Sequence, residues 1–276
     1  MPTIATEKLT DTVGAVVTGV DADQLLVDGF ADWCLEALEE NGALVFRDLH
    51  VDDATQVAFS KRLGRVETFN PKAEHPEIFL VTLDKSKNRS AAYLKGTFDW
   101  HIDGMTEDIP IMATLLSARA VATSGGETEF ASTYAAYDDL SDEEKERYLD
   151  VRVVHTIAAS QRSVFPNPTP EQQAVWDSRP AKEHPLIWQH RSGRRSLVLG
   201  ATTDHVVGME PDESRAFLDG LLDRATDPAR VYRHTWAVGD LVIWDNRGVL
   251  HRACPYDEAS PRDMHRTTLF GDEPVQ

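Results

Sequence analysis

The segment DLVIWDNRGVLHRA, residues 240–253, decides the fold class of this 276-residue chain. DLVIWDN is an apolar run with the length of a buried strand, and GVLHRA after it has the pattern of a second strand. Asp245 and Asn246 lie between the two runs, where Asx side chains often bond their own backbone, so we expect both to be structural. The segment therefore predicts two strands joined by a hairpin turn, with His251 on the second strand.

Further strands are predicted on both sides of this segment. Short apolar runs bounded by turn signals lie at 14–19, 43–48, 78–83, 111–118, 151–158, 185–190, 195–200, 229–236 and 265–270. Helical spacing of apolar residues predicts helices at 24–41, from Asp52 or Asp53 to Gly64, at 141–150 and at 210–225. Many short strands with few helices favour a mainly β fold with flanking helices, a sandwich or jelly roll, over a doubly wound parallel sheet.

Composition and charge narrow the class of protein. Hydrophobic residues make up 41% of the chain and charged residues 27%, which is typical of globular proteins. The net charge of −18 repels phosphates and anionic lipid, so we expect neither nucleic acid nor a membrane as partner. We also expect no leader and no membrane-spanning segment, because no apolar run has the required length. Two cysteines, Cys34 and Cys254, exclude a disulfide framework and favour a reducing, cytoplasmic compartment.

An H-x-D motif, His101-Ile102-Asp103, is the first candidate for a metal-binding site. In a strand, residues i and i+2 point to one face, so this imidazole and this carboxylate can meet one metal ion. A second histidine from elsewhere would complete a two-histidine, one-carboxylate set, which leaves coordination positions open on Fe(II). A second H-x-D, from His50 to Asp52, has a structural explanation, because Asp52 lies where a helix needs an N-cap.

Five prolines between residues 166 and 185 mark an irregular surface excursion at 160–185. Two interpretations stay open for this segment: a spacer loop, or a lid over a site, since long loops in compact domains are often functional.

Several motifs accompany His101 in a fixed order. GGETEF places Thr128 after the H-x-D, and His251 lies far downstream with Arg262 and Arg266 after it. WHID, GGETEF, AAYDDL, EHPLIW, SGRRSLVLG, GDLVIWDNRGVLHRA and MHRTTLFGD together resemble the TauD/TfdA family of Fe(II)/2-oxoglutarate-dependent dioxygenases. The resemblance spans residues 14–274 and is closer to the phenoxyacetate branch than to the taurine branch.

The resemblance implies one domain over residues 1–276 with a double-stranded β-helix core, a cupin-like jelly roll. It implies that His101, Asp103 and His251 are the iron ligands, and that Arg262 binds the distal carboxylate of 2-oxoglutarate with help from Thr128. Arginine suits that role because its planar fork binds a carboxylate through two hydrogen bonds. Arg266 matches the position that meets the substrate anion, or helps at the cosubstrate, in such enzymes. The family's taurine enzymes carry a histidine after the helix that ends at Gly64, and this chain has none that aligns there.

The remaining polar residues of this region are expected to be structural. Arg247 and Arg252, which flank the strand of His251, are interpreted as solvent-exposed strand residues. Six other histidines have no ligand role in the resemblance and are interpreted as structural or surface residues: His155, His184, His190, His205, His234 and His265.

The resemblance implies an enzyme that uses Fe(II), 2-oxoglutarate and dioxygen to oxidise, by hydroxylation, a C–H bond of a small anionic substrate, with release of succinate and carbon dioxide. One alternative is an oxidative decarboxylase or desaturase of the same family, such as an isonitrile-forming enzyme. Another is a jelly-roll binding protein without turnover. Family habit predicts a homo-oligomer, a dimer or a tetramer. The sequence leaves the substrate unnamed.

Overall fold

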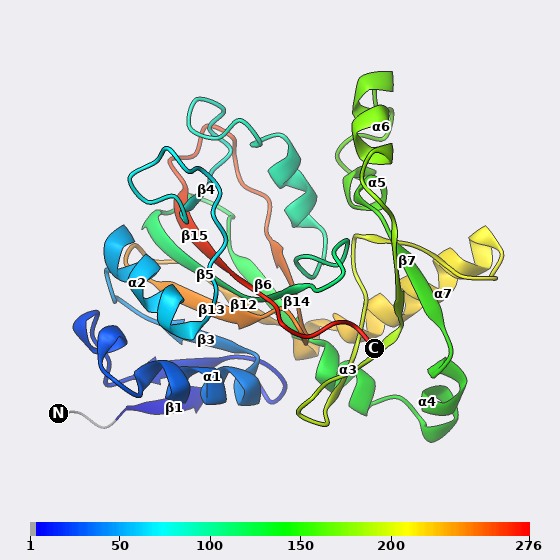
Figure 1. Ribbon diagram of the computed structural model, residues 1–276, viewed down its shortest axis with the longest axis horizontal. Helices are drawn as coiled ribbons and strands as arrows, with labels where there is room; N and C mark the ends of the chain where they lie inside the picture. The colour runs from blue at the N-terminus through cyan, green and yellow to red at the C-terminus, as the bar shows by residue number, and fades with distance from the viewer. Residues whose placement is uncertain (1–3) are drawn as a thin grey trace.

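The computed structural model describes residues 4–276, and two facing β-sheets form its core (Figure 1). The larger sheet has seven strands, in the spatial order β1 (Ala5–Lys8), β2 (Ala15–Thr18), β3 (Ala43–Phe46), β13 (Leu241–Asp245), β5 (Ile111–Ala120), β15 (Asp263–Phe270) and β4 (Phe79–Val81). The smaller sheet has the order β12 (Tyr232–His234), β6 (Thr128–Ser132) and β14 (Val249–Ala253). Phe130, Val242 and Met264 belong to one buried cluster that joins the two sheets. The expected mainly β fold, a jelly roll with flanking helices, is confirmed.

The segment 240–253 links the two sheets instead of forming a hairpin within one of them. β13 pairs with β3 and β5 in the larger sheet, whereas β14 pairs with β6 in the smaller sheet. The expected pair of strands is confirmed, but the turn between them carries the chain from one sheet to the other. His251 therefore projects from the smaller sheet at the place where the two sheets meet.

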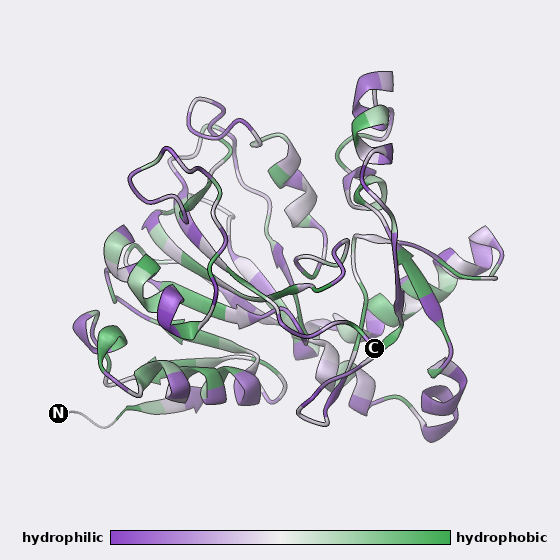
Figure 2. Cartoon of the chain, viewed as in Figure 1, coloured by the Kyte–Doolittle hydropathy of each residue, from purple (hydrophilic) through white to green (hydrophobic). Residues whose placement is uncertain are grey.

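Two helices cover the outer face of the larger sheet, α1 (Phe30–Asn41) and α2 (Asp53–Leu63). Cys34 is fully buried in this layer, and burial raises the pKa of its thiol to about 12, so it is a core residue as expected. Figure 2 shows hydrophobic residues along the strands and hydrophilic residues on the outer side of α1. Asp52 caps α2 by accepting a hydrogen bond from the Thr55 amide, as predicted from the sequence.

The helix predicted at 24–41 is interrupted. A short 3-10 helix, η1 (Asp23–Leu26), precedes α1, and Val27 between them is extended. Gly29 then has a φ of +84°, a left-handed conformation that glycine adopts without strain. Apolar spacing across this break mimics one continuous helix, because both pieces bury residues against the same sheet.

A third layer lies on the other side of the jelly roll, on the right of Figure 1. Its buried residues include Tyr148, Trp188 and Leu218. The layer contains α3 (Thr133–Asp138), α4 (Asp142–Tyr148), α7 (Pro211–Ala225), the sheet β11 (Thr203–Val206), β7 (Arg152–His155), β8 (Lys182–Pro185), and the pair β9 (Ile187–Gln189) with β10 (Arg195–Leu197). Ser141 and Glu144 form the capping box predicted for α4.

Two predicted strands of this layer have different bounds. The strand expected at 151–158 ends at His155, because the Thr156 hydroxyl caps the next helix by accepting from the Ala159 amide. The strand expected at 185–190 is divided: Pro185 ends β8, and Ile187 begins β9 in another sheet.

The proline-rich segment at 160–185 contains helical structure. α5 (Ile157–Gln161) leads into it, and α6 (Pro170–Asp177) starts with a proline in its first turn and a capping box between Thr169 and Gln172. Trp176 is buried near Phe165, at a ring distance of 6.1 Å. In Figure 1, α6 projects from the body of the molecule. Among residues 4–276, no helix is long and apolar enough to cross a membrane.

Candidate active site

The structure brings His101, Asp103 and His251 together at the junction of the two sheets. His101 and His251 pair through two backbone hydrogen bonds. The amide nitrogen of His101 lies 3.0 Å from the carbonyl oxygen of His251, and the reverse pair is 2.9 Å apart. His101 Nε2 lies 3.7 Å from Asp103 Oδ1, and His251 Nε2 lies 3.8 Å from Asp103 Oδ2. One ligand atom from each residue lies within 4.8 Å of the others. Two imidazoles and one carboxylate converge at one point.

The expected strand through the H-x-D motif is wrong in detail. His101 makes a single β-bridge, and the chain then turns at Asp103, next to Gly104 with a φ of +83°. A Cβ at Gly104 would lie 2.6 Å from the Ile111 backbone nitrogen, so a side chain has no room there. A turn, not strand alternation, directs both side chains to one point.

Hydrogen bonds hold the three side chains in place. The carbonyl of Asp99 accepts from His101 Nδ1 at 2.9 Å, which leaves the Nε2 lone pair of His101 directed at Asp103. Asp103 Oδ2 accepts a hydrogen bond from the Thr114 hydroxyl at 3.1 Å. Thr114 Oγ1 in turn accepts one from the side-chain amide of Asn246, from Nδ2, at 3.0 Å. Supporting contacts of this kind orient metal ligands in proteins. Asn246 was expected to be structural, and its structural contacts reach beyond its own turn to Thr114.

The protonation states of Asp103 and His251 suit a metal ion. Burial opposes ionisation of Asp103, but electrostatic interactions with His251, Arg266 and His101 outweigh it and lower the Asp103 pKa to about 2. Burial, assisted by His101, lowers the pKa of His251 to about 3. At neutral pH the carboxylate is therefore ionised and His251 is neutral, the forms that coordinate metals.

Thr128 and Arg262 line a small cavity beside His101 and His251. The cavity has a volume of about 50 Å³, and Arg266 also lines it. Thr128 lies on β6, and its hydroxyl oxygen accepts a hydrogen bond from Trp236 Nε1 at 3.0 Å. Sequence reasoning missed Trp236, because only the fold places its side chain next to Thr128.

Arg262 is a buried cation without a full set of partners. Its side chain is 2% exposed, its Nη1 has no hydrogen-bond partner among the described residues, and it lies over the Tyr256 ring at 4.8 Å. Burial lowers the pKa of the guanidinium, an effect that Tyr256 opposes. Gly126 makes room for it, since a Cβ there would approach the Arg262 side chain to 3.1 Å. An unpaired buried cation is costly, so this position requires an anionic ligand.

Arg266 faces the same cavity from β15. Its Nη1 lies 4.0 Å from Asp103 Oδ2, and its guanidinium lies 4.8 Å from the ring centroid of Phe79 and 5.6 Å from that of Phe69. Its Nε is buried without a hydrogen-bond partner. Arg262 precedes β15 by one residue, with a register shift between Asp263 and Met264, and the two arginines line the same cavity. Asp103 is the one described acidic residue within 4 Å of Arg266.

The remaining histidines lie outside this site, as expected. His50 contacts Asp48 in the loop before α2. His155, His184, His190 and His234 are buried elsewhere, His205 pairs with Asp204, and His265 pairs with Asp53.

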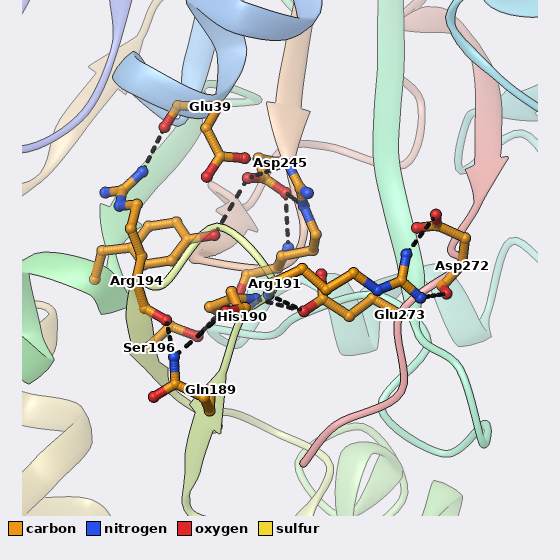
Figure 3. Close-up of polar contacts among 11 residues, drawn as sticks. Glu39, Gln189, His190, Arg191, Arg194, Ser196, Asp245, Asp272 and Glu273 are labelled. Carbon is orange, nitrogen blue, oxygen red and sulfur yellow. Dashed lines mark hydrogen bonds and ion pairs between the residues drawn. The ribbon is translucent and has the colours of Figure 1, made fainter.

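The interpretation of Arg247 as an exposed residue is wrong. Arg247 is one-fifth exposed and pairs with Asp245 at 2.8 Å and with Glu39 at 2.8 Å. Asp245 is fully buried, and its Oδ1 also accepts from the Arg247 amide. Figure 3 shows Glu39 and Asp245 in this network, close to the 189–196 segment and to Glu273. The segments that meet here are far apart in sequence, which is why the strand pattern did not reveal the pairing.

Arg252 is 39% exposed and pairs with Glu129.

Comparisons with known proteins identify a family and several related chains. Residues 5–268 match the family model described as "Taurine catabolism dioxygenase TauD, TfdA family". The (S)-phenoxypropionate/alpha-ketoglutarate-dioxygenase of Sphingobium herbicidovorans is 35% identical over 95% of this chain and 93% of its own length. The alpha-ketoglutarate-dependent 2,4-dichlorophenoxyacetate dioxygenase of a Burkholderia species is 36% identical over 85% of this chain and 83% of its own. The crystal structure of AAD-2 in complex with Mn(II) and N-oxalylglycine has a TM-score of 0.84 at 34% identity, covering 99% of this chain and 100% of that one.

Proposed function

The chain belongs to the TauD/TfdA family and is an Fe(II)- and 2-oxoglutarate-dependent dioxygenase, and we propose that His101, Asp103 and His251 hold its iron. The observation that carries the proposal is the convergence of these three ligand atoms within 4.8 Å, next to an unpaired buried arginine. Two histidines and one carboxylate leave positions open on Fe(II). When bound, iron supplies the activation of dioxygen that couples decarboxylation of 2-oxoglutarate to succinate with oxidation of a C–H bond.

Thr128 and Arg262 are the proposed binding residues for 2-oxoglutarate. The buried Arg262 guanidinium supplies a charge and an unoccupied donor, Nη1, for a carboxylate. The Thr128 oxygen already accepts from Trp236, so its own proton is available to donate to the same carboxylate. Burial of Arg262 also excludes water from this end of the cavity, which strengthens the ion pair.

Arg266 is the proposed anchor for the anionic group of the substrate. With Arg262 committed to 2-oxoglutarate, Arg266 is the second cation in the cavity, and its Nε has no partner. Relatives named for (S)-phenoxypropionate and 2,4-dichlorophenoxyacetate act on carboxylates, which supports a carboxylate substrate here. A carboxylate on Arg266 would hold the neighbouring C–H bond close to the three proposed ligands.

Succinate formation tests the activity. The purified protein is incubated with Fe(II), 2-oxoglutarate, oxygen and phenoxyacetate, and succinate is measured with and without iron. Iron-dependent succinate formation that His101→Ala removes is the expected result. A folded wild-type protein that binds 2-oxoglutarate but forms no succinate under any condition would favour the alternative of a jelly-roll binding protein without turnover.

Three proposals concern the whole molecule. The chain forms one domain over residues 1–276, works in the cytoplasm, and assembles as a dimer or tetramer. Both cysteines are free and buried, which supports a reducing compartment. Light scattering after size-exclusion chromatography measures the number of subunits.

A further inference from the structure

A second, larger cavity opens on the Asp103 side of the site. Its volume is about 570 Å³, and the residues on its wall include Glu67, Asp103, Glu107, Asp108, Arg266 and Thr268. Asp103 and Arg266 thus contact both this cavity and the metal centre. A ligand on Arg266 that is too large for the cavity beside Thr128, which holds only about 50 Å³, would have to extend into this space.

The charges on this wall are unbalanced. Asp108 is taken up by an ion pair with Lys182, and Asp103 belongs to the proposed metal ligands. Glu67 and Glu107 make no ion pair within 4 Å of any described cation. Burial raises the pKa of the Glu67 carboxyl. The Arg266 guanidinium lowers this pKa, and the carboxylates of Asp103 and Glu107 raise it further. The wall therefore presents two carboxylates, Glu67 and Glu107, without a described cation within 4 Å, and Arg266 acts on Glu67 only from a longer distance.

The backbone fixes Glu67 next to Arg266. The Glu67 amide donates to the Thr268 carbonyl at 2.9 Å, and Val66 makes a β-bridge with Leu269. Glu67 thus lies beside β15, two positions from Arg266. Any carboxylate that pairs with Arg266 comes close to the Glu67 carboxylate, and like charges in a partly desolvated cavity repel each other.

Thr268 supplies an independent sign of a ligand. Its side chain is 2% exposed, it lines the cavity, and its Oγ1 has no hydrogen-bond partner among residues 4–276. Buried hydroxyls are rarely left without a partner, so this oxygen is expected to bond a polar group of a bound molecule.

We propose that the substrate carries a basic nitrogen as well as a carboxylate, with the carboxylate on Arg266 and the nitrogen against Glu67 and Thr268. This inference rests on the proposed function, because it uses Arg266 as the carboxylate anchor. An ammonium group supplies the cation that Glu67 lacks and a donor for the Thr268 oxygen. It also removes the repulsion between Glu67 and the bound carboxylate. Amino-carboxylates thus fit this wall better than the ether acids named for the relatives.

Two ligands of matched shape test the proposal. N-benzylglycine and benzyloxyacetate differ only in a secondary ammonium group against an ether oxygen next to the same CH₂-carboxylate. Each is titrated by calorimetry, without oxygen, into enzyme loaded with Fe(II) and 2-oxoglutarate. Wild type is expected to bind N-benzylglycine at least about tenfold more tightly, the factor for one hydrogen bond to a charged group.

Two variants separate Glu67 from the general charge of the cavity. Glu67→Gln keeps the shape of the side chain and removes its charge, and it is expected to lose the preference for N-benzylglycine. Asp108→Asn removes a carboxylate from the same wall that Lys182 already neutralises, and it is expected to keep the preference.

Equal wild-type affinities for the two ligands, including the absence of binding by either, would overturn the proposal, as would a preference that Glu67→Gln retains. Iron-dependent succinate formation is measured on the same protein preparations in a separate assay to which oxygen is admitted. If it is present, only the substrate inference has failed, and if it is absent, the proposed function has failed as well.

Discussion

The indole nitrogen of Trp236 donates a hydrogen bond of 3.0 Å to the hydroxyl oxygen of Thr128. Both side chains are buried, and Trp236 packs edge-on against His234 at a ring distance of 4.4 Å. His234 is held in turn by Asp240 at 3.2 Å and by the Tyr232 hydroxyl at 2.9 Å. Trp236 thus occupies one acceptor position of the Thr128 hydroxyl oxygen, and the hydroxyl proton is directed away from the indole. This makes Trp236 a positioning residue for the proposed cosubstrate site.

Trp236→Phe is therefore expected to raise the half-saturating concentration of 2-oxoglutarate by about fivefold, which corresponds to about 1 kcal/mol for one hydrogen bond. The maximal rate of succinate formation should change less. Trp188→Phe is the matched control, because Trp188 Nε1 is buried without a partner and lies in the third layer. Both variants should lower the melting temperature, and only Trp236→Phe should change half-saturation. Equal half-saturation in both would remove Trp236 from this role.

Each of His101→Ala, Asp103→Ala and His251→Ala should abolish iron-dependent succinate formation while the protein stays folded, because each removes one of three protein ligands from an open site. Circular dichroism checks the fold, and metal analysis after dialysis checks iron retention. His50→Ala should keep its activity, since the His50 ring contacts the Asp48 carboxylate and Gly239, away from the three proposed ligands. An inactive His50→Ala together with an active His101→Ala would show that the wrong H-x-D motif was chosen.

Arg262→Ala should raise the 2-oxoglutarate requirement steeply, because breaking a buried ion pair costs roughly 3–5 kcal/mol. Arg262→Lys should restore only part of the affinity, since an ammonium cannot make the two-pronged contact. Arg262→Met should raise the melting temperature in the absence of 2-oxoglutarate, because it removes a buried charge with an unpaired nitrogen. Unchanged half-saturation in Arg262→Ala would refute the assignment.

Arg266→Gln should abolish the discrimination between a carboxylic acid substrate and its amide. Wild type should prefer the acid, because the amide cannot pair with the guanidinium. The half-saturating concentration of 2-oxoglutarate should change little in this variant, since Arg262 carries that contact. The comparison uses succinate formation with phenoxyacetate and phenoxyacetamide. Equal turnover of acid and amide by wild type would show that Arg266 is not an anion anchor.

The free energy of unfolding should fall as the pH drops from 7 to 5. Burial lowers the pKa of His155 to about 3 and that of His190 to about 4, whereas a histidine in the unfolded chain has a pKa near 6.5. The unfolded state therefore binds protons first, and each buried neutral histidine costs on the order of 2 kcal/mol of stability at pH 5. Urea titrations at both pH values measure the loss. It should be smaller in His155→Gln than in wild type and unchanged in the exposed control His205→Gln.

Local sequence patterns predicted the elements that depend on residues close in the chain. Asp52 caps α2, and Ser141 with Glu144 caps α4, because a helix end needs partners within one turn. The alternation of short apolar runs and turn signals indicated the jelly roll, since each run buries its own side chains. The family resemblance named the three residues that converge at the site.

Contacts between distant segments were decided by the tertiary structure alone. Spacing within an H-x-D motif implied a strand, and the structure replaced it with a turn at Gly104, packed against Ile111. The sequence pattern around Arg247 predicted an exposed strand residue, whereas the fold places Glu39 2.8 Å from its guanidinium.

The surroundings of the candidate site were also decided by contacts between distant segments. Trp236 reaches Thr128 from the end of the neighbouring strand β12, and Glu67 reaches the wall of Arg266 through a backbone contact with Thr268. A sequence pattern reports only neighbours within a few positions, whereas burial and charge pairing depend on which faces pack together. The sequence therefore determined the fold class and, through the family motifs, the candidate ligands. Packing alone determined the second cavity and its uncompensated charge.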